Sequence, residues 1–429
     1  MAEKTVVFVD GARIPFLKSG TAYSSLMAYD LGRMALSGLL ARVSMPSALI
    51  DQVIMGNVIQ EVKTSNISRE CALGAGIPNS VQAYTVAMAC ISSNQAIALG
   101  VNAIKSGQAR IVLAGGTETM SDIPVRFRKK FRQKVLAARK YSSPLDFLGF
   151  LKGLRFKDLL PELPAIAEFS TRETMGESAD RMAARFGISR PDQDAYAMRS
   201  HHKAAEAGKS GLLDQEIIPA KVPPSFTISY QDNGIREDTT LEKLAKLRPA
   251  FIKPHGTITA GNASYLTDGA SACLLMEKET ALELGIQPKA IIREFTFTAQ
   301  DTKEELLLGP AYATPKVLEK ARLTLDDIDV FEIHEAFAGQ VLAVLAALNS
   351  DSFARASLGT SQKTGEIPME KINTWGGSLS IGHPFGATGT RLVTTAVNRL
   401  HHEDGNFALV TACAAGGQGH AMLVERYKA

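Results

Sequence analysis

One recurring pattern limits the folds that this chain can adopt. A reactive side chain at a turn is followed by a helical segment, a short apolar strand and a pair of glycines. The pattern runs once from Cys90 to Gly116 and once from His383 to Gly417. Because two copies of one local order are most simply built by two copies of one structural unit, the sequence predicts a duplicated α/β fold.

Short apolar strands alternate with helical segments along both parts of the chain. We expect strands at residues 6–9, 53–58, 111–114, 330–333 and 407–411. We expect helical segments at residues 28–41, 91–106, 317–321 and 385–402. This alternation indicates parallel strands that are connected by crossover helices.

A chain of 429 residues is too long for one ordinary core, so two or three domains are expected. With 45% hydrophobic and 21% charged residues, the composition is typical of a globular protein. We expect an N-terminal half at 1–122 and 254–285, an inserted domain at 123–253 and a C-terminal half at 286–429. The insertion has few strand signals and much charge, which favours a role as a cover over a binding site.

Several classes of protein are disfavoured. The net charge of +3 is too small to predict nucleic-acid binding. The cysteines lack the regular spacing of a disulfide framework or a zinc site, so we expect a reducing compartment, the cytoplasm. The first residues lack the features of a secretory signal. No apolar run approaches the roughly 20 residues of a spanning helix.

Cys90 and His383 each occupy a turn before a predicted helix. A thiol at a helix N-terminus lies in a partial positive charge, which favours the thiolate, and its own N–H can face an oxyanion. His383 lies between Gly382 and Pro384, which fixes an imidazole at the turn in the way that a general base requires.

Cys413 and His334 follow or end predicted strands. Small residues after Cys413 leave the sulfur open to a substrate and expose backbone N–H groups. His334 opens a predicted helix in IHEAFAGQ, but the segment lacks the second histidine of the H-E-x-x-H zinc motif. We therefore expect no metal, and a positioning role for His334. Two thiols and an imidazole at one point would suit carbon–carbon bond chemistry on thioesters.

The chain resembles the thiolases, a family of acetyl-CoA C-acyltransferases, over nearly its whole length. The resemblance lies in the Cys90 and Cys413 turns and in GTITAGNAS at 256–264, TDGA at 267–270, HEAF at 334–337 and GHPFGATG at 382–389. It implies two repeated βαβαβαββ halves in a five-layered α/β/α/β/α sandwich, with a loop domain inserted in the first half.

The resemblance also implies the catalytic roles. Cys90 would carry the acyl group, His383 would take its proton, and Cys413 would act as acid and base on the acetyl-CoA enolate and on CoA. His334 and His383 would bind the enolate oxygen. The backbone N–H groups of Cys90 and Ala415 would form a second oxyanion hole.

Three further positions are implied to contact CoA, which acts as a co-substrate while no permanently bound cofactor is expected. Ser264 would contact the pantetheine arm, and Met175 would line its channel. Arg236 would meet the nucleotide, although an ordinary surface arginine is an equally good interpretation.

Two departures narrow the resemblance. His334 stands where most thiolases have asparagine, and Ala415 stands where most have glycine. Both variants resemble the β-subunits of trifunctional fatty-acid-oxidation complexes, including the bacterial anaerobic type. This implies a homodimer within a heterotetramer whose α-subunits carry hydratase and 3-hydroxyacyl-CoA dehydrogenase activities.

The implied reaction is the CoA-dependent cleavage of medium-chain and long-chain 3-ketoacyl-CoA in fatty-acid β-oxidation. The alternatives are a short-chain acetyl-CoA acetyltransferase, a 3-ketoacyl synthase and a non-catalytic thiolase-like scaffold. Because the synthases use one cysteine and two histidines, Cys413 disfavours that alternative.

A basic and then amphipathic stretch stands within the insertion. Residues 126–140 contain eight lysines and arginines and no acid, which suits a solvated helix face or a CoA phosphate. Residues 144–166 place leucines and phenylalanines among cationic residues. This part could contact a membrane, cover an acyl channel or bind an α-subunit.

Overall fold

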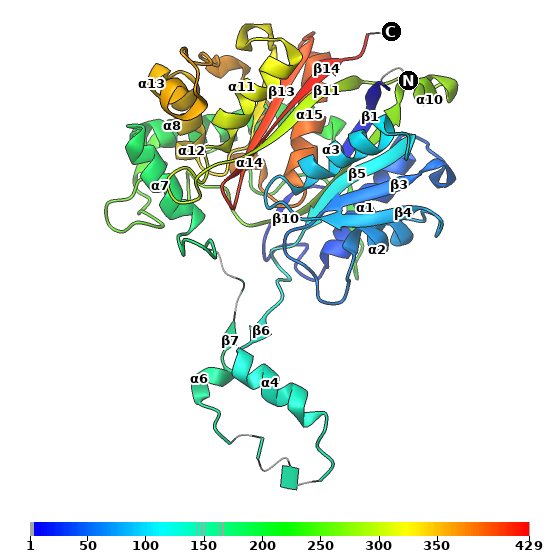
Figure 1. Ribbon diagram of the computed structural model, residues 1–429, viewed down its shortest axis with the longest axis vertical. Helices are drawn as coiled ribbons and strands as arrows, with labels where there is room; N and C mark the ends of the chain where they lie inside the picture. The colour runs from blue at the N-terminus through cyan, green and yellow to red at the C-terminus, as the bar shows by residue number, and fades with distance from the viewer. Residues whose placement is uncertain are drawn as a thin grey trace.

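The computed structural model describes residues 4–143, 145–146, 149–150, 152–162, 164 and 167–428. These residues form two similar α/β halves that share a continuous sheet, and an arm that extends from the body (Figure 1). None of the described helices combines the length and the apolar character that crossing a bilayer requires.

The first half follows the predicted order βαβαβαββ. Its elements are β1 (Val6–Arg13), α1 (Ala28–Arg42), β3 (Gln52–Gly56), α2 (Ile67–Gly74), β4 (Gln82–Val86), α3 (Ser92–Lys105), β5 (Ile111–Glu118) and β10 (Thr267–Glu277). Strands β3, β4 and β5 are parallel, whereas β10 lies antiparallel between β5 and β1. Strand β1 is buried along its whole length, because both faces of this sheet are covered by helices.

The second half repeats this order with one strand reduced. Its elements are β11 (Ala290–Ala299), α11 (Gly309–Ala321), β12 (Val330–Ile333), α12 (Ala338–Leu348), α15 (Thr388–His402), β13 (Phe407–Ala414) and β14 (Gln418–Arg426). In place of a third strand, Ile372 makes a single parallel bridge to Phe331. The predicted duplication is therefore confirmed, with this local difference.

The two half-sheets join edge to edge. Their order is β12-β13-β14-β11-β1-β10-β5-β3-β4, and the short strand β2 (Leu17–Lys18) also pairs with β10. The junction is antiparallel, with Val7 opposite Ile291 and Phe8 opposite Ala290. Among the described residues, β4 pairs only with β3, so it forms one edge of the sheet.

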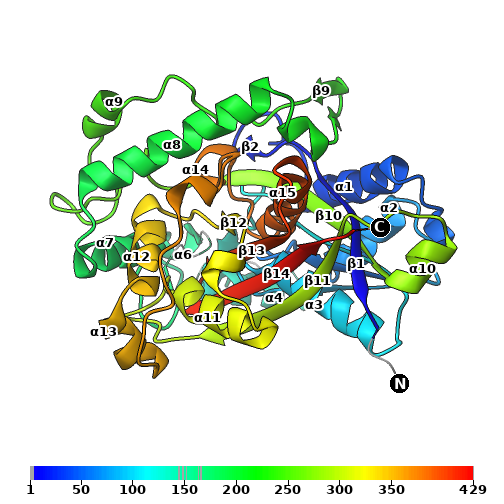
Figure 2. The ribbon, with the colours of Figure 1, turned by 90° about the horizontal axis from the view of Figure 1, so that it is seen from above.

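The helices form three layers around the two half-sheets (Figure 2). Helices α3 and α15 contact each other and pack with both half-sheets in one apolar cluster. Helices α1 and α2 cover the outer face of the first half-sheet, and α11 and α12 cover that of the second. The predicted five-layered sandwich is confirmed, and α15 is buried on every side because it lies in the central layer.

Part of the insertion packs on the second half. Helices α7 (Met175–Arg185) and α8 (Arg190–Lys209) contact α12. Thr174 caps α7, because its hydroxyl accepts the N–H of Glu177 at 3.2 Å. The remaining elements are β8 (Ala220–Val222), β9 (Thr227–Ser229), α9 (Leu241–Ala245), α10 (Lys278–Glu283), α13 (Asp351–Phe353) and α14 (Ser378–Ile381), with short 3₁₀ and π turns between them.

The described residues of the segment 126–162, which we call the arm, project away from the body instead of covering it (Figure 1). Strands β6 (Arg126–Phe127) and β7 (Pro161–Glu162) pair at its base, and it carries α4 (Lys129–Ala138) and α6 (Phe156–Leu159). Helix α4 has no buried residue. Seven residues of the predicted amphipathic stretch lie outside the described residues, namely Pro144, Phe147, Leu148, Leu151, Leu163, Ala165 and Ile166.

Candidate active site

The loops that carry Cys90, His334 and His383 meet between the two halves. The Sγ atom of Cys90 and one ring nitrogen from each histidine lie within 4.8 Å of one another. The two imidazole centroids are 4.0 Å apart. Residues separated by more than half of the sequence thus face one point.

Cys90 lies just before α3, which begins at Ser92 and not at the predicted residue 91. The preceding residue, Ala89, adopts a φ of 46°, a left-handed conformation that costs an alanine roughly 1 kcal/mol. The backbone N–H groups of Cys90 and Ala415 both act on the Cys90 sulfur. An oxygen close to that sulfur would therefore meet two amide donors.

The predicted preference of Cys90 for the thiolate is wrong for the resting protein. Burial raises the pKa of the Cys90 thiol to about 12, and the carboxylates of Glu118 and Glu168 add to this. The two backbone N–H groups lower the pKa, but they do not outweigh desolvation. A base must therefore remove the proton before the sulfur can attack.

His383 has the hydrogen bonds of a base that is ready to accept a proton. Its Nδ1 lies 2.6 Å from Oγ1 of Thr388, whose hydroxyl donates to the carbonyl of Pro384 at 2.9 Å. The Thr388 hydroxyl oxygen therefore accepts the Nδ1–H of His383, which leaves Nε2 as an unprotonated acceptor. Burial lowers the pKa of His383 to about 3, with a further contribution from the charge of Arg391.

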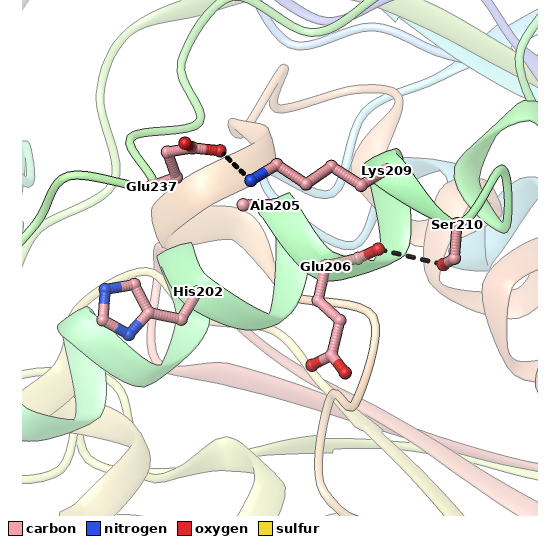
Figure 3. A pocket seen from close by; sticks show the side chains of 6 residues that line it. All are labelled: His202, Ala205, Glu206, Lys209, Ser210 and Glu237. Atoms are coloured by element: carbon pink, nitrogen blue, oxygen red, sulfur yellow. Dashed lines mark hydrogen bonds and ion pairs between the residues drawn. The ribbon is translucent and has the colours of Figure 1, made fainter.

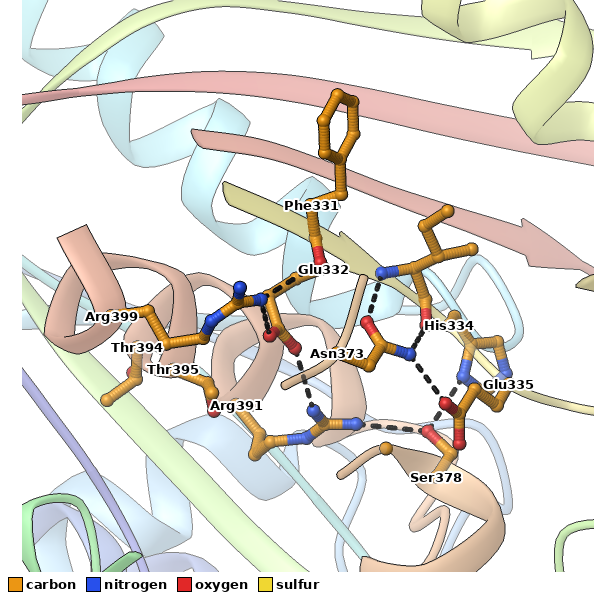
Figure 4. A network of polar contacts seen from close by, with 12 residues as sticks. Phe331, Glu332, His334, Glu335, Asn373, Ser378, Arg391, Thr394, Thr395 and Arg399 are labelled. Carbon is orange, nitrogen blue, oxygen red and sulfur yellow. Dashed lines mark hydrogen bonds and ion pairs between the residues drawn. The ribbon is translucent and has the colours of Figure 1, made fainter. Parts of the chain in front are cut away.

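His334 is fixed in a different way. Its Nδ1 lies 3.0 Å from Oγ of Ser378, which also accepts a hydrogen bond from Arg391 at 3.0 Å (Figure 4). The Ser378 hydroxyl can donate its own hydrogen to Nδ1, and Nε2 of His334 then carries a proton that can be donated. Burial lowers the pKa of His334 well below its usual range, and the charges of His383 and Arg391 act in the same direction.

Helix α12 begins at Ala338, later than the prediction that His334 would open it. The residues between His334 and α12 are not helical, and among them Glu335 is fully buried. Its carboxylate accepts from Asn373 at 2.6 Å and from the Leu379 N–H at 3.1 Å. These bonds tie the His334 loop to the segment that leads to His383.

A buried ion cluster supports the same region (Figure 4). Glu332 lies 2.8 Å from Arg399 and 3.5 Å from Arg391, and all three side chains are fully buried. Arg391 in turn holds Ser378. Arg391 therefore acts on His334 through one intervening hydroxyl. This link could not be predicted from local sequence patterns, because its members are far apart along the chain.

Cys413 lies in β13, beside a tight loop. Gly416 and Gly417 have φ values of 82° and 66°, which favour glycine and let the loop expose its N–H groups. Glu168 accepts the Gly416 N–H at 3.0 Å. Burial, followed by the charge of Cys90, raises the pKa of the Cys413 thiol well above its usual range.

The N-termini of α3 and α15 touch each other. A Cβ atom on Gly389 would lie 2.1 Å from the side-chain oxygen of Asn94, so only glycine fits there. The N–H of Thr390 donates to Oγ of Ser93 at 3.0 Å. The loops that carry Cys90 and His383 are therefore held together by direct contact of the two central helices.

Glu118 was missed by the sequence reasoning, although a carboxylate at the end of a buried strand was a signal. It accepts the N–H groups of Val58, Ile59 and Gly386 at 3.0–3.1 Å, and the amide of Asn57 at 3.1 Å. Burial raises the pKa of Glu118 to about 8. This side chain holds the His383 loop to the end of β3.

The predicted pantetheine contacts lie near the reactive loops. The N–H of Ser264 donates to the carbonyl of Ala336 at 2.9 Å, and Leu266 forms a bridge with His383. Met175 opens α7 and packs partly buried against the second-half core. The structure thus brings Ser264 and Met175 to elements that adjoin the site.

Arg236 is placed differently. It is exposed, and its N–H donates to Nδ1 of His201 at 3.2 Å. A hollow of about 690 Å³ opens at Glu237, the residue that follows Arg236 in the sequence (Figure 3). Its lining comes from His202, Ala205, Glu206, Lys209, Ser210 and Glu237. None of these residues belongs to the reactive loops, and Lys209 and Glu237 neutralise each other at 2.6 Å, so the hollow is not the site of chemistry.

Known proteins are similar to this chain in both sequence and fold. The family models match residues 6–279 as the thiolase N-terminal domain and residues 286–426 as the thiolase C-terminal domain. A "Trifunctional enzyme subunit beta, mitochondrial" from Bos taurus is 58% identical over 424 residues, which cover 99% of this chain and 89% of the relative. A 3-ketoacyl-CoA thiolase from Yersinia enterocolitica is 46% identical over 420 residues, which cover 98% and 96%.

A solved structure gives the same result. The acetyl-CoA acetyltransferase of Bacillus anthracis is similar with a TM-score of 0.86 and 32% identity, over 99% of this chain and 100% of that chain. The matches span both halves and the junction at which the reactive loops meet. The chain therefore belongs to the thiolase family.

Proposed function

We propose that this thiolase cleaves 3-ketoacyl-CoA with CoA, which releases acetyl-CoA and an acyl-CoA shortened by two carbons. The observation that carries the proposal is the meeting of Cys90, His334 and His383 beside the Cys413 loop. The Yersinia relative is named for the same substrate class.

In the first half-reaction, Nε2 of His383 takes the proton of Cys90, and the sulfur attacks the C3 carbonyl. The N–H groups of Cys90 and Ala415 stabilise the oxyanion. Its collapse breaks the C2–C3 bond, and the electron pair passes to the acetyl-CoA enolate. Nε2–H groups of His334 and protonated His383 hold the enolate oxygen, and Cys413 protonates C2.

In the second half-reaction, the Cys413 thiolate takes the thiol proton of an incoming CoA. The CoA sulfur attacks the acyl thioester on Cys90, and the N–H groups of Cys90 and Ala415 again face the oxyanion. Collapse releases the shortened acyl-CoA. The Cys90 thiolate recovers the proton that His383 retained, and the enzyme returns to its starting state.

We propose medium-chain and long-chain substrates, with a short-chain acetyl-CoA acetyltransferase as the alternative that the Bacillus anthracis relative favours. The test measures CoA-dependent cleavage of 3-ketoacyl-CoAs from four to sixteen carbons, with Cys90→Ala as the inactive control. Activity that rises with chain length supports the proposal. Activity confined to acetoacetyl-CoA supports the alternative, and the absence of activity together with an unreactive Cys90 indicates a scaffold.

We further propose a homodimer that assembles with an α-subunit carrying hydratase and 3-hydroxyacyl-CoA dehydrogenase activities. The high identity to a trifunctional enzyme subunit beta supports the α-subunit. Among the described residues β4 (Gln82–Val86) pairs with β3 alone, and although Asn66 donates to the Ala83 carbonyl, this strand edge is suited to pairing with a second copy. Light scattering of the purified chain, with Ala83→Pro as an edge-blocking variant, tests the dimer, because a proline there removes a backbone donor.

The arm supports a peripheral membrane contact. It exposes basic residues of α4 together with apolar side chains such as Phe127 (51% exposed), Leu136 (60%) and Phe156 (80%). We expect the chain to sediment with anionic vesicles at low salt. Lys129→Glu combined with Arg139→Glu should weaken this, whereas the matched body variant Lys246→Glu with Lys316→Glu should not. Equal binding by both variants would contradict the role of the arm.

We also propose that the chain works in a reducing compartment such as the cytoplasm. All four cysteines are free thiols, and two of them stand at the reactive loops. The Bos taurus relative is named as mitochondrial, so fractionation of the source cells is the direct test.

A further inference from the structure

The three groups at the centre of the site are also three metal ligands. A thiol sulfur and two imidazole nitrogens lie within 4.8 Å of one another, from Cys90, His334 and His383. Thiolate sulfur and imidazole nitrogen are both zinc ligands, and zinc sites with three protein ligands and an open fourth position are well known. The H-E-x-x-H zinc motif places two histidines on one helix, whereas here the fold brings the second imidazole from a different loop.

The free nitrogen of each histidine is available to an ion. Nδ1 of His383 is bonded to Thr388, and Nδ1 of His334 is bonded to Ser378. The two Nε2 atoms are buried, and neither has a hydrogen-bond partner among the described residues. Metal-ligating histidines are typically held in this way, by an oxygen at the ring nitrogen that does not bind the metal.

The surroundings permit an ion to enter and to be held. Cys90 as a residue is only partly buried, although its thiol group is desolvated, so an ion has to reach the sulfur by the way that the acyl substrate does. Two carboxylates, Glu118 and Glu168, lie close enough to act on the charge of the Cys90 sulfur, whereas Arg391 opposes a cation and is itself paired with Glu332. The Ser378 hydroxyl can accept as well as donate, so it can hold His334 with the proton on Nδ1 and with Nε2 free.

We propose that Cys90, His334 and His383 form an inhibitory site for a soft divalent cation, Zn²⁺ or Cd²⁺, in the free enzyme. The sulfur–metal bond replaces the S–H bond, and the thiol proton passes to solvent. An acylated Cys90 is a neutral thioester and cannot supply the thiolate that binds the metal, so the acyl group and the metal exclude each other. Hard cations such as Mg²⁺ prefer oxygen ligands and are not bound here.

The test is a titration of the intact, substrate-free protein with Zn²⁺ and with Co²⁺. We expect one high-affinity ion per chain, and a thiolate-to-cobalt charge-transfer band for Co²⁺. Cys90→Ser should abolish that band, and His334→Asn should weaken the binding of Zn²⁺ by about 100-fold or more, because losing a direct ligand exceeds the 10–100-fold effect of losing a supporting contact.

His420→Asn is the matched control. It also removes a buried imidazole whose Nε2 has no partner, but His420 lies outside the three-ligand cluster, so Zn²⁺ affinity should be retained. Binding that Cys90→Ser and His334→Asn leave unchanged, in variants whose circular dichroism shows that they are folded, would overturn the proposal. Because the experiment measures metal binding and not turnover, its result tests the metal site independently of the proposed cleavage reaction.

Discussion

The two halves of the molecule use the same strand ends for different purposes. In the first half Gly56 pairs with Gly116, and in the second half Ile333 pairs with Thr411. Asn57 is the residue after Gly56, and His334 is the residue after Ile333, so these two are equivalent. Glu118 lies two residues after Gly116, and Cys413 lies two residues after Thr411, so these two are equivalent as well.

The two equivalent pairs have different roles. Asn57 and Glu118 support the structure, whereas His334 and Cys413 take part in the chemistry. The amide of Asn57 donates to Glu118, and the carboxylate holds the loop after β3 and the loop of His383. His334 and Cys413 instead stand at the reactive loops. A duplicated fold can therefore use the strand ends of one half to support the site while the equivalent strand ends of the other half carry the reacting side chains.

The strongest test concerns the nucleophile that the first half contributes. Cys90→Ala should lower turnover by roughly 10⁴-fold or more and abolish acyl labelling, because the covalent intermediate cannot form. Cys273→Ala, a buried thiol elsewhere in the first half, should retain acyl labelling. Labelling that persists in Cys90→Ala would show that another residue carries the acyl group.

The next test concerns Cys413. Cys413→Ala should slow turnover by roughly 10²–10⁴-fold, which is typical of a lost general acid or base. Cys90 should still react with iodoacetamide, and the free energy of unfolding should change by only about 1 kcal/mol. Rapid-quench measurement of acylation and of thiolysis would locate the loss. Full activity would remove Cys413 from the chemistry.

A substitution at Glu118 should lower the stability of the protein strongly, in contrast to a substitution at Cys413, which should mainly lower turnover. Glu118→Ala leaves the N–H groups of Val58, Ile59 and Gly386 without an acceptor, at about 1–3 kcal/mol each, so we expect a loss of about 3 kcal/mol or more in urea unfolding. Glu118→Gln keeps an acceptor oxygen and should lose less. A Glu118→Ala protein that is as stable as the parent but inactive would contradict the structural role of Glu118.

The smallest expected effect is in the pH dependence of acylation. Burial lowers the pKa of His383 to about 3, so the neutral base persists as the pH falls through 6.5, the usual value for histidine. The burst rate of acylation should therefore show no fall centred near pH 6.5. A fall centred there would indicate an imidazole that titrates as if it were exposed to water.

The fold and the principal reactive residues could be predicted from local patterns. Strand–turn–helix order gave the duplicated halves, and the small residues around Cys90, His383 and Cys413 marked the turns. The supports of the site could not be predicted in this way. Glu168 bonds to Gly416 across 248 residues, and no local pattern connects the two.

Two other differences have physical causes. The thiolate of Cys90 was expected from its place before a helix, but desolvation outweighs the amide donors. Helix α12 starts later than expected because the Glu335 carboxylate binds Asn373 and the Leu379 N–H, which ties the residues after His334 to another segment of the chain. Both outcomes depend on burial, which a single segment does not reveal.

The contact of Gly389 with Asn94 also bears on how such a chain can evolve. The two central helices meet so closely that no side chain fits at Gly389. Each half supplies one of these helices, and the nucleophile and its base stand at their ends. A substitution at this contact in one half would therefore displace the reactive residue of the other half, so the two halves are constrained to change together.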